Sequence, residues 1–178
     1  MSPRRDDGPG AAAILDALPE PRAREALLRC CGCARWVDDM LAARPFDDDE
    51  VLFAEAARLW ASATPAEILE ALGHHPEIGA DLDRLRERFA STATWSSAEQ
   101  AGVGAADEAT LLALQAGNVA YKQRHGFLFV VCATGKSAAE MLALLQARLG
   151  NDSDLELANA AREQGTITRL RLAKLGAE

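Results

Sequence analysis

The sequence contains no apolar run that approaches the roughly 18 residues of a membrane-spanning helix. Its first ten residues, MSPRRDDGPG, carry two arginines, but two aspartates follow them and the apolar core of a signal peptide does not. The final residues, Leu-Gly-Ala-Glu, are not a peroxisomal tripeptide. We therefore expect no targeting segment, no membrane partner and a cytoplasmic location.

An excess of positive charge is also lacking. The chain of 178 residues has a formal net charge of −8 and a sequence pI near 4.9. A nucleic-acid groove or a surface for anionic lipid needs clustered lysine and arginine, so neither partner is expected. A small anionic substrate is compatible with this charge, because one or two arginines in a pocket can outweigh the global field locally.

Cysteine and histidine are scarce and lack the spacing of a metal site. Three of the four cysteines crowd into Cys30, Cys31 and Cys33, and Cys132 is far away. This spacing is too tight for a zinc ribbon and has no matching second pair, which favours buried helix thiols in a reducing compartment. The three histidines form no His-x-x-x-His pair, so we expect no metal.

Helical periodicity dominates the remaining pattern, and only residues 127–133 resemble a strand. A single strand has no partner, so a sheet is not expected. We predict an all-α, single-domain helical bundle over residues 11–178 with one short extended buried segment, after a disordered tail of residues 1–10. The predicted helices span residues 11–18, 21–43, 51–63, 65–73, 81–89, 96–124, 137–149 and 153–175.

Three glycines modify these predicted helices. Gly32 lies inside the second one, where it predicts a kink or a close helix approach. Gly102 and Gly104 predict an interruption near the start of the long helix over 96–124.

A Ser/Thr-x-x-Glu pattern recurs where helices should begin, and there it is typical of a capping box, in which side chain and backbone bond reciprocally. Taken alone, the pattern therefore indicates a helix start rather than catalysis. The four pairs are Thr64/Glu67, Ser96/Glu99, Ser137/Glu140 and Ser153/Glu156.

The histidines differ in context. His75 precedes Pro76, which pushes the backbone away from helix, so this imidazole should stand on a loop after a helix end. A titratable ring there and the Glu99 carboxylate near a helix N-terminus can together make an acid/base site. His74 is the neighbouring alternative, and His125 is interpreted as a cation at a helix C-terminus.

Arg169 and Arg171 lie two residues apart in a predicted helix. Their side chains therefore project about 200° apart, and at most one of them can enter a given pocket.

Several motifs occur in one order along nearly the whole chain after the tail. They are His75-Pro76-x-Ile78-Gly79, Ser96-x-x-Glu99-Gln100-x-Gly102, Asn118-x-x-Tyr121, Arg124-x-Gly126-Phe127-x-Phe129-Val130-Val131, Gly135-Lys136-Ser137, Arg148-Leu149 with Glu156, and Ile167-x-x-x-Arg171-Leu172-x-x-Leu175. Each is weak alone, but the ordered set resembles the 2-oxo-4-hydroxy-4-carboxy-5-ureidoimidazoline (OHCU) decarboxylases, whose reaction completes the conversion of urate to (S)-allantoin. One departure is His125, where that family usually has an aromatic residue.

The resemblance implies an all-helical carboxy-lyase that uses no cofactor and no metal and commonly forms a homodimer. It implies His75 and Glu99 as catalytic residues. The implied substrate contacts are Pro76, Ser96, Gln100, the backbone near Val131, and Arg171.

The chemistry agrees with these residue types. The substrate carries a carboxylate and a hydroxyl on one ring carbon beside a C=N bond, so it supplies its own electron sink. His75 would then act as general acid/base, and Arg171 would pair with a substrate oxygen. The alternative from another class is a non-enzymatic helical interaction module. An unrelated hydrolase is not expected, because this sequence has no serine on a strand-turn-helix elbow that could serve as nucleophile.

Overall fold

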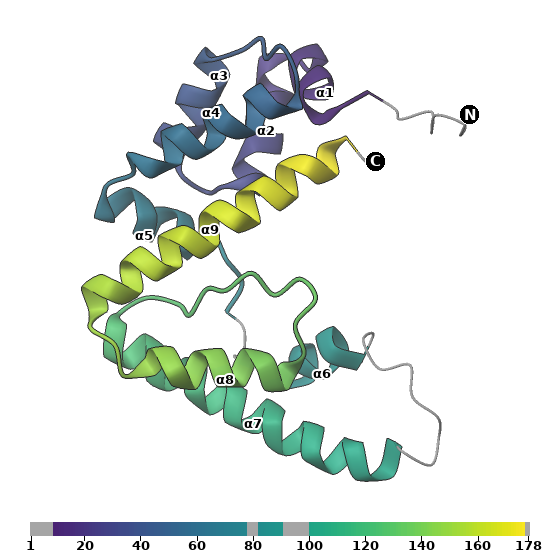
Figure 1. Ribbon diagram of the computed structural model, residues 1–178, viewed down its shortest axis with the longest axis vertical. Helices are drawn as coiled ribbons and strands as arrows, with labels where there is room; N and C mark the ends of the chain where they lie inside the picture. The colour runs from purple at the N-terminus through teal and green to yellow at the C-terminus, as the bar shows by residue number, and fades with distance from the viewer. Residues whose placement is uncertain (1–8, 78–81, 91–99, 177–178) are drawn as a thin grey trace. The chain divides into compact units, whose positions relative to one another are not determined.

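The computed structural model describes residues 9–77, 82–90 and 100–176, which form nine α-helices and no strand (Figure 1). The predicted all-α class is confirmed. In chain order the helices are α1 (Ala11–Ala17), α2 (Glu20–Cys30), α3 (Ala34–Ala42), α4 (Asp49–Ala61), α5 (Pro65–Gly73), α6 (Leu82–Ala90), α7 (Gln100–His125), α8 (Ala138–Leu149) and α9 (Ser153–Leu175). Within these residues no helix has the length and apolar character needed to cross a membrane.

The described chain divides into two compact units, each with its own apolar core. The first unit comprises the residues up to His74 and those from Ala161 onward, and the second comprises His75–Ala160. The first core is built from fully buried residues that include Leu15, Leu27, Trp36, Leu52 and Leu172. The second core includes Leu85, Leu114, Tyr121, Met141 and Leu145.

The single helix predicted over residues 21–43 is wrong. The structure has two helices there, α2 and α3, separated by three residues. The backbone is extended at Cys31 (φ −147°, ψ 118°) and at Cys33 (φ −111°, ψ 114°). Gly32, between them, is a poor helix former, and both helices still place their apolar faces in the same core.

The predicted interruption of the long helix is also wrong, because α7 runs without a break from Gln100 to His125. A glycine costs about 1 kcal/mol in a helix interior relative to alanine, which a long helix with packed turns can tolerate. The helix ends as predicted at Gly126, whose φ of +80° is a left-handed conformation that favours glycine.

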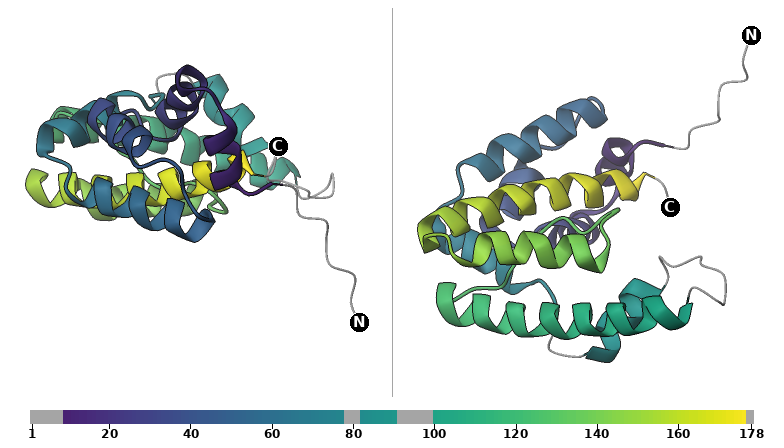
Figure 2. Two further views of the ribbon diagram at one scale, coloured as in Figure 1. Left: turned by 90° about the horizontal axis from the view of Figure 1, so that it is seen from above. Right: turned by 60° about the horizontal axis from the view of Figure 1, so that its bottom comes forward.

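The segment after α7 is buried without joining a sheet. Helices α7 and α8 lie side by side and run in the same direction, so residues 127–137 return along them (Figures 1 and 2). Phe129, Val130, Val131 and Cys132 are all buried. The predicted buried segment is confirmed, and the left-handed Gly135 (φ +75°) closes it.

Two of the four predicted capping boxes are confirmed, namely those led by Thr64 and Ser137. The third is wrong. Ser153 is already the first residue of α9, and the Glu156 amide donates to the Asp152 carbonyl oxygen. The Glu156 carboxylate is completely buried and binds other groups. The fourth pair lies outside the described residues.

Replacing the Thr64 cap should destabilise the protein by about 1 kcal/mol, because Thr64→Ala removes the side-chain oxygen that accepts the Glu67 amide. Thr166→Ala is the matched control. The Thr166 hydroxyl only donates to the Arg162 carbonyl of its own helix on an exposed face, and alanine is the better helix former there. Chemical denaturation of both variants measures the difference, and equal losses would contradict the capping assignment.

Candidate active site

The turn that carries the predicted catalytic histidine begins where α5 ends. His74 is the C-cap of α5, with φ −82° and ψ −7°, and His75 follows it outside any helix. His75 is half-buried, whereas His74 and Pro76 are exposed. The predicted loop position of His75 is therefore confirmed.

In the first unit, His74 packs against the backbone of Gly32. A Cβ atom built on Gly32 would lie 2.3 Å from Cγ of His74 and 2.5 Å from its Cβ. Such distances are far below van der Waals contact, so the break between α2 and α3 and the end of α5 require glycine at this position. The sequence predicted a kink or a close helix approach inside a helix; the structure has instead a break between two helices, approached by the His74 side chain.

In the second unit, the same turn is tied to α7. The carboxylate of Glu77 pairs with the ammonium of Lys122, and both side chains are exposed to solvent. An exposed pair contributes little stability, about 0–1 kcal/mol. Residues 78–81, which include Ile78 and Gly79 of the motif, lie outside the described residues.

The two candidate arginines point in different directions, as their spacing predicted. Nη1 of Arg171 donates to the carbonyl oxygens of Arg29 at 3.1 Å and Cys30 at 3.5 Å. These carbonyls close α2, where helix geometry leaves them without intrahelical partners. The guanidinium of Arg169 instead lies 4.5 Å from the centre of the Phe53 ring. Arg171 and His74 thus contact the two ends of the stretch 29–32.

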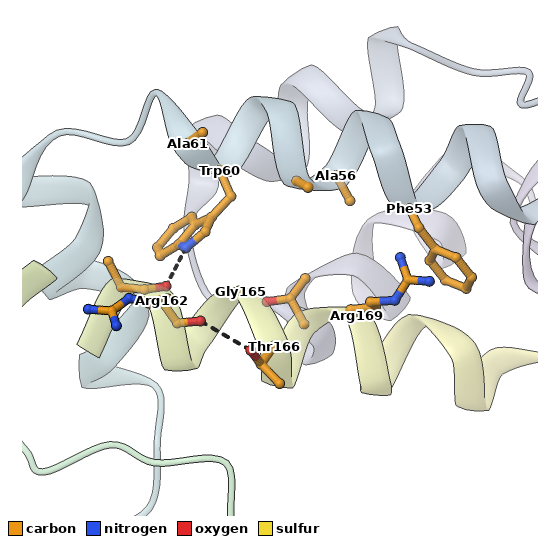
Figure 3. A pocket seen from close by; sticks show the side chains of 11 residues that line it. Phe53, Ala56, Trp60, Ala61, Arg162, Gly165, Thr166 and Arg169 are labelled. Atoms are coloured by element: carbon orange, nitrogen blue, oxygen red, sulfur yellow. Dashed lines mark hydrogen bonds between the residues drawn. The ribbon is translucent and has the colours of Figure 1, made fainter. Parts of the chain in front are cut away.

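Arg169 borders a pocket of about 360 Å³ between α4 and α9 (Figure 3). Ala56, Gly165 and Thr166 are among the residues that line it. The Trp60 indole donates its Nε1 hydrogen to the Ala161 carbonyl oxygen at 2.7 Å. Pro76, Val131 and Arg171, the predicted substrate contacts that the structure describes, do not line this pocket.

Val131, the predicted backbone contact, lies in the buried segment of the second unit and is 5% exposed. The carbonyls on either side of it are held by cations. The Val130 oxygen accepts from Nη1 of Arg148 at 3.1 Å, and the Cys132 oxygen accepts from Nζ of Lys136 at 2.8 Å. Neither backbone group of Val131 hydrogen-bonds to a described residue.

Glu156 is the centre of a buried polar network beside this segment. Its Oε2 accepts from the Tyr121 hydroxyl at 2.5 Å and from Nε of Arg148 at 2.8 Å. Its Oε1 accepts from the side-chain amides of Asn151 and Asn159, each at 2.8 Å. Burial opposes the charge, but these four donors outweigh it and hold the pKa of Glu156 below its usual value. Sequence reasoning missed this role because the local pattern is that of a cap.

Two rings complete the surroundings of Glu156. Burial, and then the hydrogen bond to Glu156, raise the pKa of Tyr121 well above its usual value, so its hydroxyl remains a donor. The buried His125 ring lies 4.4 Å from the Tyr121 ring, and its Nδ1 is 2.9 Å from Oγ of Ser153. His125 ends α7 as predicted, and its buried ring packs in an aromatic cluster with Tyr121 and Phe127.

All four cysteines are buried, as predicted, and none forms a disulfide, but only Cys30 lies in a helix, so the predicted helical placement is wrong for the other three. Burial raises the pKa of Cys30 to about 11 and that of Cys31 to about 12, so both stay protonated near neutral pH and are poor nucleophiles. In the part of the chain that the structure describes, no three His, Cys, Asp or Glu side chains are grouped to hold a metal ion.

The remaining predicted site residues precede α7 or begin it. Ser96 and Glu99 lie outside the described residues. Gln100 is the first residue of α7, and its side chain is likewise outside the description. Their roles stay predictions.

Comparison with known proteins identifies the family. The family model for OHCU decarboxylase matches residues 16–173. The chain belongs to the OHCU decarboxylase family. This match includes every predicted site residue.

Individual relatives agree with the family match. The chain is 35% identical over 148 residues to the uric acid degradation bifunctional protein TTL of Arabidopsis thaliana, covering 82% of this chain but only 45% of the plant protein. It is 29% identical over 140 residues to the OHCU decarboxylase of Haloferax volcanii, covering 78% and 80% of the two chains. A crystal structure of OHCU decarboxylase in the presence of (S)-allantoin superposes with a TM-score of 0.69 at 31% identity, over 87% of this chain and 99% of that one.

The contact between Gly32 and His74 predicts a sharp difference between two glycines. Gly32→Ala should lower the free energy of unfolding by about 1–3 kcal/mol, because the new methyl group overlaps His74. Gly73→Ala, one residue before His74, meets nothing within 4 Å and should be neutral or stabilising. Thermal and urea unfolding of the two variants measures this, and equal behaviour would argue against the close approach.

The Glu156 network predicts a pH-dependent contribution to stability. A carboxylate whose pKa is lowered by folding stabilises the native state above its unfolded pKa of about 4.3, and this contribution is lost as pH falls through the folded value. Wild type should therefore have a higher free energy of unfolding than Glu156→Gln at pH 7. The difference between the two free energies should become smaller below about pH 4. Urea titrations at several pH values measure it, and a gap independent of pH would contradict the assignment.

Proposed function

We propose that this protein catalyses the cofactor-free decarboxylation of OHCU to (S)-allantoin in urate catabolism. The observation that carries the proposal is the family match over residues 16–173, which leaves only the ends of the chain outside it. It is supported by the related OHCU decarboxylase that was crystallised in the presence of (S)-allantoin. A bifunctional relative named for uric acid degradation points to the same pathway.

The reaction needs little from the protein beyond binding and proton transfer. When the carbon–carboxylate bond breaks, its electron pair forms a C=C bond to the neighbouring ring carbon, and the C=N pair moves onto nitrogen, which takes a proton. The resulting enol then loses its hydroxyl proton while the neighbouring carbon is protonated on one face. The substrate is its own electron sink, which supports catalysis without a cofactor or a metal.

His75 is the proposed general acid/base for these proton transfers. It stands on a half-buried turn outside any helix. Glu99 would orient His75 or hold the ring and ureido N–H groups, with Ser96, Gln100 and Pro76 completing that side of the substrate. The backbone of Val131 would bind a polar edge of the ring.

Arg171 is the proposed partner of a substrate oxygen. Only its Nη1 is used on the α2 carbonyls, and its Nε and Nη2 make no hydrogen bond to described residues. Two N–H groups side by side suit the planar geometry of a carboxylate. Arg169 is the less suitable choice because its guanidinium stacks on Phe53.

We further propose that the protein works in the cytoplasm as a homodimer. Four free, buried cysteines support a reducing compartment. The homodimer is proposed from the family resemblance.

The proposal is tested by following circular dichroism while urate oxidase and hydroxyisourate hydrolase generate OHCU in situ. We expect rapid growth of an (S)-allantoin signal only when this protein is added. A slow racemic product that the protein does not accelerate would overturn the enzymatic assignment and favour the helical interaction module.

The adjacent histidines provide matched variants for the acid/base role. His75→Asn should lower kcat by roughly 10²- to 10⁴-fold, because it removes the proton-transfer group. His74→Asn should retain most of the activity, since that ring is assigned to the contact with Gly32. The same dichroism assay on both folded variants decides between them, and the reverse pattern would move the assignment to His74.

A further inference from the structure

We propose that the buried Arg148–Glu156–Tyr121 network positions the substrate-binding backbone at Val131. These residues do not touch substrate; they would act through the segment that Arg148 holds. The inference rests on the proposed function, because it takes Val131 as a substrate contact.

Arg148 contacts the segment at two consecutive residues, Phe129 and Val130. Its Nη1 donates to the Val130 carbonyl oxygen, and its guanidinium lies 4.8 Å from the centre of the Phe129 ring. The charge-assisted bond fixes the direction of the peptide plane between Val130 and Val131. That plane carries the Val131 N–H group.

The backbone groups of Val131 lie between two held carbonyls. Lys136 holds the Cys132 carbonyl on the other side, so the segment is clamped on both sides of Val131. The N–H and C=O groups of Val131 make no hydrogen bond to described residues although the residue is 5% exposed. Buried backbone groups are nearly always paired in folded proteins. The Val131 N–H, whose direction Arg148 fixes, and the Val131 C=O, which lies between the two bonded carbonyls, are suited to the C=O and N–H edges of a ureido or imidazoline ring.

Arg148 is itself held in place by Glu156. Its Nε donates to Glu156, whose four acceptor sites are filled by donors from α7, α8, α9 and the turn between the last two. A buried carboxylate with all its bonds made is rigid, and loss of one partner is strongly destabilising to the arrangement. Glu156 thus fixes the Arg148 rotamer, and Arg148 fixes the segment.

The test compares two arginine-to-lysine changes. Arg148→Lys keeps the charge but cannot bond Glu156 and Val130 together. Arg58→Lys is the control, because Arg58 is exposed and bonds the Glu55 side chain of its own helix, outside the network. Two readouts are taken on folded protein: kcat/KM in the coupled dichroism assay, and amide hydrogen exchange of residues 128–133.

We expect Arg148→Lys to lower kcat/KM by about 10- to 100-fold, the scale of a misplacement near 1 Å. We also expect it to speed exchange in residues 128–133 while the rest of the second unit stays protected. Arg58→Lys should leave both readouts within about twofold of wild type. If Arg148→Lys does not fold, Tyr121→Phe decides, because it removes only the hydroxyl bond to Glu156 and keeps the ring contacts. It should show the same pattern with a smaller loss.

The outcomes separate the two proposals. Wild-type protein that does not accelerate decarboxylation overturns the proposed function and, with it, the role assigned to the network. Active wild type with unchanged kcat/KM in the folded network variants overturns the positioning role alone. Lost activity with unchanged exchange at residues 128–133 also overturns it, because the effect would then not pass through the segment.

Discussion

A single buried carboxylate organises the second unit. Glu156 is completely buried, and an unpaired ion of this kind would cost several kcal/mol of desolvation. The carboxylate is compensated only because its partners come from separate elements: Tyr121 from α7, Arg148 from α8 and Asn159 from α9 itself. The non-helical segment joins through the bond from Arg148 to Val130. These elements therefore keep their mutual arrangement together or lose it together, which explains how a segment outside any sheet can be held in place.

The first unit depends on a different constraint, the space available at Gly32. The chain turns there from α2 into α3, and the His74 ring occupies the volume that any larger residue would need. Arg171 caps the carbonyl end of α2 next to this turn. The backbone of residues 29–32 thus contacts both His74 at the end of α5 and Arg171, the proposed substrate-binding arginine. Packing and capping define the surroundings of the candidate residues that the structure describes.

Sequence was a good guide wherever local chemistry decides the structure. The starts of α5 and α8 follow from Thr64-Pro65 and Ser137 with their glutamates, and the end of α7 follows from Gly126. Residue spacing alone also separated Arg169 from Arg171. The ordered motifs indicated the family, which no single pattern could do.

The errors occurred where distant residues decide. Ser153-x-x-Glu156 is locally indistinguishable from a capping box, and only Tyr121, 35 residues away, reveals the buried role of the glutamate. The break at Gly32 depends on contact with the His74 side chain, and the periodicity of apolar residues carries no information on such a distant contact. The helix through Gly102 and Gly104 is unbroken although single-residue propensity argues against it. The roles of Ser96, Glu99 and Gln100 stay predictions.

The most direct test of this account is a crystal structure of the protein with (S)-allantoin bound. We expect the ligand to contact both the His75 imidazole and the Val131 backbone. Allantoin bound instead in the pocket between α4 and α9, with His75 and Val131 free of it, would contradict the proposed site.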